Sequence, residues 1–384
     1  MGEKGRGAGS SRACRDAEGA PVERVATSPT PFDLAAQALL DRYGLRGCTL
    51  EPLCYSENHT YRVTRQKDGR HVATARICRP GYRNVGELQA EVSWLLRLHH
   101  AVHLEGAELI RPLQAADGTY VQSIQLPDDG QALHAVAFAY MEGSQPGDDD
   151  PVALRRLFRR LGALAAALHA HATPEAAGVS LRQPLRLPGT PVLMRPTWDC
   201  TTALGSRATW GDWRSFPGLT SHDARILAQA EARIKHAMAA YGKPRDRFGL
   251  IHADMRLANL LVEGAGPHGT LKLLDFDDCA YSWYLFDLAA SLSFIEARPD
   301  LSDLISCWLG GYRAAGASST ARPLAPADVA VIPSLVMMRR LQLTGWLSTR
   351  HDSDPASLVS PTWRDDTVSM ALRYLGGNLI AAEE

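Results

Sequence analysis

The sequence predicts an α+β fold with two lobes, a small antiparallel-sheet N-lobe and a large, mostly helical C-lobe. Short apolar and β-branched runs separated by turns dominate residues 48–140, whereas segments with apolar residues at helical spacing dominate residues 151–378. The length of 384 residues, with 45% hydrophobic and 22% charged residues, suits a globular chain. We therefore expect a disordered tail at 1–29, an N-terminal lobe at 30–140 and a C-terminal lobe at 141–384.

Composition and charge argue against several classes of protein. The net charge is −1, so there is no bulk electrostatic case for a nucleic-acid or anionic-membrane partner. The seven cysteines are dispersed without a C-x-x-C pair, which argues against a disulfide framework or structural zinc. No apolar run approaches the roughly 20 residues that span a bilayer. We therefore expect a cytoplasmic protein with neither a nucleic-acid nor a membrane partner.

The N-lobe is expected to consist of short strands and two helices. Its predicted elements are a helix at 31–43, strands at 48–54, 60–64 and 72–77, a helix at 85–99, and strands at 120–126 and 132–140. The first two strands are joined by a small polar turn that contains Ser56 and Asn58. The backbone N–H groups of this turn, with both side chains, are candidates for holding phosphate oxygens. An ordinary hairpin turn is the alternative.

Two further positions in this lobe are candidates for nucleotide binding. Arg76 lies near the end of the third strand, and Glu91 on the following helix is its expected partner, with a surface ion pair as the alternative. The last strand runs into Tyr140 and Met141, where we expect the connection between the lobes. The backbone of this connection is the expected binding position of an adenine base.

The C-lobe is expected to be mostly helical. Asp150 and Pro151 are a typical helix start, and further helices are expected at 222–241, 301–315, 326–348 and 363–378, with Pro333 kinking the third of these. The irregular stretch 173–220 contains three tryptophans with nearby acids, which either bind a polar or cationic substrate or fix the loop to the core. The sequence does not place four other candidates for substrate contact, Arg339, Arg340, Trp346 and His351.

The chemistry is concentrated in residues 250–290. Asn259–Val262 and Leu271–Leu274 are expected to form a hairpin, and Asp254 and Asn259 stand in the order D-x-x-x-x-N. In a kinase catalytic loop with this spacing, the aspartate receives the proton of the acceptor hydroxyl and the asparagine holds Mg²⁺. Asp275 follows an apolar strand, as the aspartate of a D-F-G motif does, although the triplet here is Asp-Phe-Asp. Asn259 and Asp275 supply the oxygen ligands that Mg²⁺ prefers.

Two other features of this region bear on nucleotide binding. Arg256, two residues after Asp254, is a candidate for contacting the γ-phosphate because its guanidinium is a fork-shaped cation. The glycine-rich stretch 264–269 matches G-x-G-x-x-G, but it is followed by a strand rather than a helix. A dinucleotide fingerprint opens a helix, so we interpret this stretch as a turn.

Six short segments of the chain resemble the aminoglycoside phosphotransferase and choline-kinase-like superfamily, which has a protein-kinase-like fold. The matching pieces are SENHTYRV, ARICRPGYR, LGALAAALHAHA, RPTWD, LIHADMRLANLLV and LKLLDFDD, which lie between about residues 30 and 300. The bacterial stress-response kinase and homoserine kinase groups look nearest. The resemblance implies ATP and Mg²⁺ as cofactors, Asp254 as catalytic base, Asn259 and Asp275 as metal ligands, and His252 as a structural part of the loop.

Two residues depart from the pattern of this superfamily. Arg76 replaces the usual lysine. Ala253 stands where many members have glycine, a change that is tolerated where the backbone is helical or extended.

Three functions are compatible with these patterns. The first is a kinase that uses Mg·ATP to phosphorylate a hydroxyl of a small polar metabolite or aminoglycoside-like compound. The second keeps the fold but takes a protein serine or threonine as acceptor, and the third is a pseudokinase that only binds nucleotide or a partner. The intact set of Asp254, Asn259 and Asp275 favours catalysis.

Overall fold

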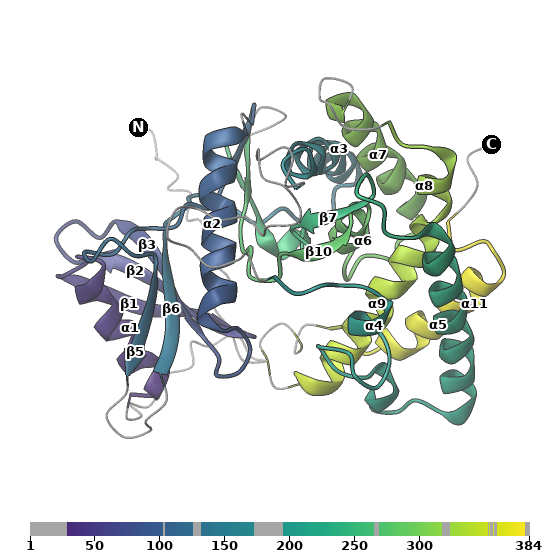
Figure 1. Ribbon diagram of the computed structural model, residues 1–384, viewed down its shortest axis with the longest axis horizontal. Coiled ribbons are helices and arrows are strands. Elements are labelled where there is room, and N and C mark those ends of the chain that lie inside the picture. Colours follow the sequence, from purple (N-terminus) through teal and green to yellow (C-terminus); the bar gives the residue numbers. More distant parts are fainter. Residues whose placement is uncertain are drawn as a thin grey trace, which may run out of the picture.

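A computed structural model describes residues 29–102, 104–125, 132–172, 195–264, 269–316, 323–351, 353, 356 and 359–380. The two-lobed α+β fold is confirmed, with a sheet-rich N-terminal region beside a larger helical region (Figure 1). The predicted tail at 1–29 lies outside the described residues apart from its last residue. Most of the glycine-rich turn and residues 173–194 of the irregular stretch also lie outside them.

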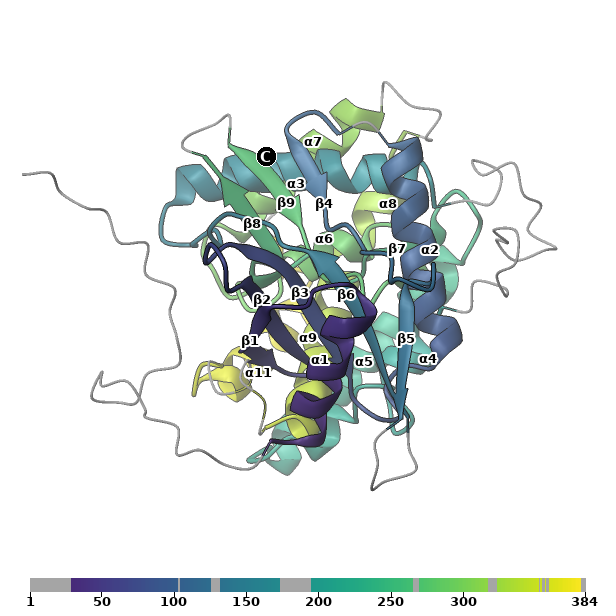
Figure 2. The same cartoon turned by 90° about the vertical axis from the view of Figure 1, so that its left-hand side faces the viewer.

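The N-terminal region is a five-stranded antiparallel sheet with one helix on each face. The strands are β1 (Cys48–Tyr55), β2 (Asn58–Arg65), β3 (His71–Cys78), β5 (Val121–Gln125) and β6 (Ala132–Ala139), in the order β1-β2-β3-β6-β5. Helix α1 (Pro31–Arg42) lies in front of this sheet in Figure 2. Helix α2 (Val85–Ala101) lies between the sheet and the helical region (Figure 1).

The alternation of side chains along β6 explains why one helix packs on each face. Ala135 and Ala137 belong to a small core with α1, whereas Val136 and Phe138 belong to the main core with α2. Successive side chains of a strand point to opposite faces, so both faces of β6 are buried. The N-terminal sheet is therefore joined to the main core through α2.

Short strands bring the functional segments together. A three-stranded sheet has the order β4-β9-β8, made of β4 (Ala107–Leu109), β9 (Thr270–Leu273) and β8 (Leu260–Glu263). The pair β7 (Phe248–Ile251) and β10 (Ala280–Trp283) flanks the catalytic segment. The predicted hairpin is confirmed, but β4, β7 and β10 were not expected. Strand β4 precedes the predicted lobe boundary and yet pairs with β9, and the boundary stays a prediction.

The helices of the C-terminal region follow the predicted order. They are α3 (Pro151–His169), α4 (Cys200–Ala203), α5 (Ser221–Tyr241), α6 (Phe286–Ser291), α7 (Leu301–Gly316), α8 (Pro326–Ala330), α9 (Ile332–Thr349) and α11 (Trp363–Leu375). The kink expected at Pro333 is a break at Val331, with the proline in the first turn of α9, where its missing N–H costs no hydrogen bond. Among the described residues, no helix combines the length and apolar character needed to cross a membrane.

Candidate active site

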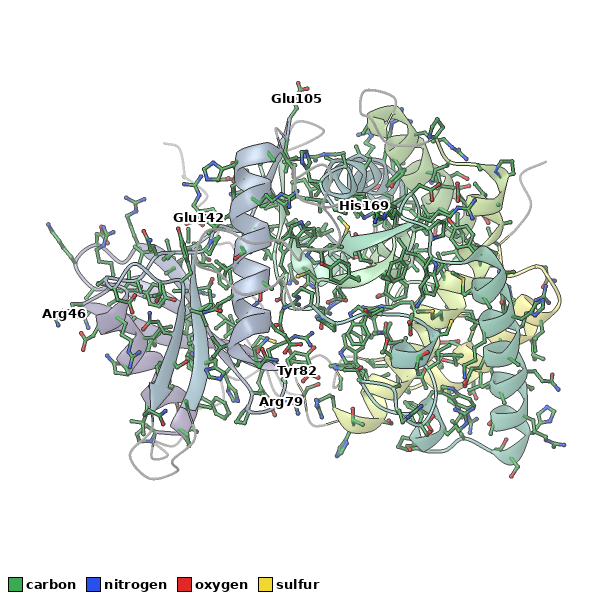
Figure 3. The ribbon with its side chains drawn as sticks, in the orientation of Figure 1. Arg46, Arg79, Tyr82, Glu105, Glu142 and His169 are labelled. Atoms are coloured by element: carbon green, nitrogen blue, oxygen red, sulfur yellow. The ribbon has the colours of Figure 1, made fainter. Side chains whose placement is uncertain are left out.

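The loop that follows β7 is held by a buried carboxylate on α6. Asp287 accepts hydrogen bonds from the backbone N–H of His252 at 3.2 Å and of Ala253 at 2.6 Å. His169 of α3 bonds the same carboxylate at 2.9 Å (Figure 3 labels His169). Asp287 therefore braces this loop through its hydrogen bonds. All these groups are buried, so the bonds compete little with water.

The side chain of His252 ties this loop to the loop after β9. Its Nε2 lies 2.8 Å from the carbonyl oxygen of Leu274, and its Nδ1 accepts the backbone N–H of Asp254 at 3.2 Å. The ring also meets Phe276 edge-on, with 4.5 Å between the ring centroids. With Nδ1 as an acceptor, Nε2 is the nitrogen that donates to the carbonyl of Leu274. The side chain of His252 thus connects the loop before Asp254 to the loop that carries Asp275.

Three neighbouring side chains hold the carboxylate of Asp254. Its Oδ2 accepts the amide of Asn259 at 2.8 Å and the Nε of Arg256 at 3.2 Å, and its Oδ1 accepts a hydrogen bond from Arg339 of α9. Burial by itself would raise the pKa of Asp254, but Arg339 and then Arg256 outweigh it and hold the pKa below its ordinary value. The carboxylate therefore stays ionised, as a proton acceptor must.

Asp275 faces the same cleft as Asp254. The backbone N–H of Leu274 bonds the carbonyl of Asn259 at 2.9 Å, which places Asn259 beside the residue that precedes Asp275. The Asp275 side chain is 47% exposed to the cleft and lies 3.3 Å from Arg76. Partial withdrawal from water, and then the nearby carboxylate of Asp277, raises the pKa of Asp275 despite Arg76. Such a carboxylate favours a cation as its partner.

The donor set fits a magnesium ion that is shared with phosphates. The amide nitrogen of Asn259 is held by Asp254, so its oxygen is the atom left for a ligand. Within the part of the chain that the structure describes, no three acidic, histidine or cysteine side chains gather to hold a metal alone. Mg²⁺ is commonly held by one or two protein oxygens with substrate phosphates completing its shell, which matches Asn259 with Asp275.

The predicted pairing of Arg76 with Glu91 is confirmed. The Nη2 of Arg76 lies 2.6 Å from Oε2 of Glu91, and both side chains are almost fully buried. The alternative of a surface ion pair is wrong for this reason. Arg76 thus links α2 to Asp275 and places a fixed positive charge behind the cleft.

The other residues predicted to contact the nucleotide differ in their distance from the cleft and in whether their side chains are already bonded. Ser56 lines the cleft, whereas the amide of Asn58 donates to Asp277 at 2.7 Å and is already engaged. Tyr140 and Met141 lie on the connection after β6, half-buried and outside the lining of this cleft. Phosphate and adenine binding at these positions stay predictions.

Several residues at the cleft were either candidates that the sequence did not place, such as Arg339 and Trp346, or were not named from it. Trp210, Phe294 and Leu343 line it beside Asp254, and Arg339 contacts Asp254 directly. The cleft is also lined by Glu57, Asp277, Asp278 and Trp346. Trp198 and Trp213 are instead buried in the core, so of the three tryptophans in the irregular stretch only Trp210 faces this cleft. Arg340 is also buried, paired with Glu296 at 3.0 Å.

Backbone strain is concentrated at the site. Among the described residues, the non-glycine positions with positive φ are Ala253 at 68°, Asp275 at 52° and Phe294 at 72°. Asp275 and Phe294 line the cleft, and Ala253 precedes Asp254. The expectation of a helical or extended backbone at Ala253 is therefore wrong. The hydrogen bonds that Asp287 accepts from the backbone N–H groups of His252 and Ala253 hold this strained turn.

Replacing Ala253 by glycine should stabilise the protein. A non-glycine residue in the left-handed region costs about 1–2 kcal/mol, which the substitution removes. Glycine also has a larger conformational entropy in the unfolded chain, and this offsets about 0.4–1 kcal/mol of the stabilisation. We expect Ala253→Gly to raise the free energy of unfolding by about 0.5–1 kcal/mol in urea denaturation. Ala232→Gly, at an exposed position inside α5, should lower it by about 1 kcal/mol. A destabilised Ala253→Gly variant would contradict the strain.

A cleft with a held carboxylate, a second carboxylate beside an asparagine and a buried arginine–glutamate pair defines a two-lobed, kinase-like phosphotransferase. Residues 55–317 match the phosphotransferase enzyme family, which is more than half of the chain. The protein therefore belongs to the phosphotransferase enzyme family and is a phosphotransferase.

Similar proteins act on small molecules according to their names. A microcompartment-associated aminopropanol kinase of known structure is 31% identical, has a TM-score of 0.74, and is matched over 90% of this chain and 98% of its own. Amicoumacin kinase of Bacillus subtilis (strain 168) is 22% identical over 81% of this chain and 83% of its own length. The structure of an amicoumacin kinase with AMP-PNP and Ca²⁺ has a TM-score of 0.64 at 17% identity, covers 90% of this chain and 95% of its own, and shares the fold.

Proposed function

We propose that this protein transfers the γ-phosphate of Mg·ATP to a hydroxyl group of a small polar molecule, with an amino alcohol as the first candidate. The observation that carries the proposal is that Asp254 and Asp275 face one cleft. Asp254 is an ionised carboxylate in a position to accept the proton of a bound alcohol. Asp275 and Asn259 would hold the metal, which would offset the charge that develops on the phosphates.

The carboxylates and aromatic rings of the cleft suit an acceptor that carries an ammonium group. Its lining includes the five carboxylates of Glu57, Asp254, Asp275, Asp277 and Asp278 and the two guanidiniums of Arg256 and Arg339. Arginines outside the lining, among them Arg76 and Arg83, pair with several of these carboxylates, so the case rests on individual carboxylate oxygens rather than on net charge. The aromatic rings of Trp210 and Trp346 add faces on which a cation or an apolar stem can rest. The named substrate of the aminopropanol kinase has the same chemical character.

The intact ionic pairs support catalysis over nucleotide binding alone. Arg76 keeps its partner Glu91, which is the ion pair that a lysine makes in a typical kinase, and it also reaches Asp275. The arginine in place of the usual lysine is the feature of the sequence that most favours a pseudokinase. No contact in the described residues gives a specific reason to prefer a protein serine or threonine as acceptor.

The experiment is an acceptor screen with the purified full chain. ADP release would be measured with Mg·ATP and a panel that includes aminopropanol, ethanolamine, choline and an aminoglycoside. We expect ADP release that requires both an acceptor and a divalent cation, with the phosphorylated alcohol as product. ADP release that is independent of every acceptor and of the Asp254 carboxylate would count against the proposal.

Removing the carboxylate of Asp275 should change the metal requirement. Asp275→Asn keeps the shape but removes one charged ligand, so we expect about tenfold more Mg²⁺ at half-maximal activity, together with a large loss of kcat. A magnesium titration at saturating ATP measures both values. Asp149→Asn, at an exposed carboxylate before α3, is the matched control and should match the wild type. If Asp275→Asn shows the same magnesium dependence as the wild type, Asp275 is not a metal ligand.

A further inference from the structure

The tip of the β1–β2 turn is buried against the opposite lobe. Glu57 is 7% exposed, and its Oε1 accepts the indole Nε1 of Trp346 at 3.1 Å and the Nε of Arg350 at 2.8 Å. Its Oε2 accepts Nη2 of Arg79 at 2.5 Å. Turn tips normally face solvent, and a buried carboxylate is held in place by such charged donors. Figure 3 shows Arg79 at the junction between the N-terminal sheet and the helical region.

The same turn has a second attachment to the C-terminal region. The amide of Asn58 donates to Asp277 at 2.7 Å, and this contact is also buried. Ser56, Glu57 and Asn58 all line the cleft. The segment expected to cover the phosphates is therefore fixed at two adjacent positions to residues that follow the catalytic hairpin. A turn that served only to connect two strands would need neither contact.

One face of α9 joins the two ends of the cleft. Arg339, Leu343 and Trp346 are spaced at i, i+4 and i+7, so they share a face, and all three line the cleft. Arg339 contacts the carboxylate of Asp254, and Trp346 contacts Glu57. A helix is a rigid connection between these points. Helix α9 thus links the position of the turn to Arg339 and Leu343, which line the cleft beside Asp254.

We propose that Glu57 is a positioning residue for phosphoryl transfer, which closes the phosphate-covering turn onto α9 through Trp346 and Arg350 and excludes water from the cleft. The inference rests on the proposed function, because it assumes that phosphate is transferred in this cleft. A closed cleft favours the bound alcohol over water as the nucleophile. Opening the contact between Glu57 and α9 admits water and loosens the face of α9 that lines the cleft. Arg76, Asn259 and Asp275 stay in place.

The test compares transfer with hydrolysis in Glu57→Gln, Arg350→Gln and the double variant. Phosphate release from Mg·ATP without acceptor and ADP release with aminopropanol, or with the best acceptor of the screen, would be measured for the full chain. We expect each single variant to raise the ratio of hydrolysis to transfer by about tenfold and the KM of the acceptor similarly. The double variant should add little to either single change, since both remove one contact.

The controls separate positioning from general damage. Arg350→Lys keeps the charge and should restore most of the wild-type ratio, whereas Glu51→Gln removes an exposed ion pair of the same strand and should leave it unchanged. Hydrogen exchange of the nucleotide-free chain provides a readout that needs no activity. In Glu57→Gln we expect faster exchange at both 55–59 and 343–350.

The two proposals fail in different ways. A wild-type chain that turns over no Mg·ATP with any acceptor defeats the proposed function, and the positioning role falls with it. An active wild type with an unchanged ratio in Glu57→Gln and Arg350→Gln overturns the positioning role alone. Faster exchange confined to 55–59 would also overturn it, because the turn would then not be coupled to α9. A uniform loss of transfer and hydrolysis would indicate a merely structural contact.

Discussion

Asp254→Asn should reduce kcat/KM for phosphoryl transfer by about 10³, within the 10²–10⁴ that a positioned general base contributes. The substitution keeps the planar shape of the side chain but removes the charge and one of the two acceptor oxygens. The carboxylate is ionised and held by Asn259, Arg256 and Arg339, so its loss removes the proton acceptor and disturbs its surroundings. Initial rates of ADP release with the best acceptor of the screen would measure the effect.

The asparagine variant is preferable to alanine at this position. Both variants remove the charge, but alanine would also leave the buried guanidinium of Arg339 without an acceptor at this position, whereas the amide oxygen of asparagine can still accept its hydrogen bond. Binding of AMP-PNP within about threefold of the wild type would show that the nucleotide site persists. Asp149→Asn, at an exposed carboxylate before α3, is the matched control. Activity of Asp254→Asn within tenfold of the wild type would remove Asp254 from the role of base.

The catalytic hairpin was predictable because its signals are local. Asp254 and Asn259 lie five positions apart, and an apolar strand precedes Asp275, so a short stretch of sequence contains the whole pattern. Arg76 and Glu91 lie on consecutive elements, so their pairing required only the assumption that the helix packs behind the strand. Long periodic helices and strands were predictable for the same reason.

The rest of the site depends on packing between distant segments. Arg339 reaches Asp254 only because α9 packs beside the catalytic loop, and the two residues are 85 positions apart. Glu57 and Trp346 are 289 positions apart, and no pattern in the sequence pairs them. The positive φ of Ala253 has no signal in an alanine, which usually avoids that conformation.

The unexpected strands had too few residues to show a period. Strands β7 and β10 have four residues each and β4 has three, at or below the lower limit of the about four to eight residues over which alternation is readable. Strands β8 and β9 are as short, but the spacing of Asp254, Asn259 and Asp275 marked their hairpin. Their pairing is set by tertiary contacts, since β4 lies parallel to β9 from a distant part of the chain. The lobes could be predicted from composition, but the pairing that joins them could not.

Gly311→Ala should destabilise the protein by about 3 kcal/mol, at the upper end of overpacking effects. Helices α3 and α7 approach so closely that a Cβ on Gly311 would lie 1.8 Å from the carbonyl oxygen of Arg159. On the other helix, a Cβ on Gly162 would lie 1.9 Å from the carbonyl oxygen of Trp308. Both obstacles are backbone atoms, so the clash is relieved only by separating the helices. Urea denaturation of the wild type and of Gly311→Ala measures the difference in the free energy of unfolding.

The adjacent glycine provides the matched control. A Cβ on Gly310 would meet only the end of the Arg159 side chain at 3.6 Å, so Gly310→Ala should be neutral or stabilising by up to about 1 kcal/mol through helix propensity. Equal stabilities of the two variants would contradict the close approach of the helices.

The clash at Gly311 should also reach the catalytic loop. The hydroxyl of Tyr312 on α7 lies 3.0 Å from Nδ1 of His169 on α3, and His169 bonds Asp287, which holds His252 and Ala253. Separating α3 from α7 therefore loosens the support of the strained turn before Asp254. We expect Gly311→Ala to lose kcat at temperatures where it is still folded, while Gly310→Ala keeps wild-type activity. Full kcat in a folded but destabilised Gly311→Ala variant would show that the brace does not depend on this helix contact.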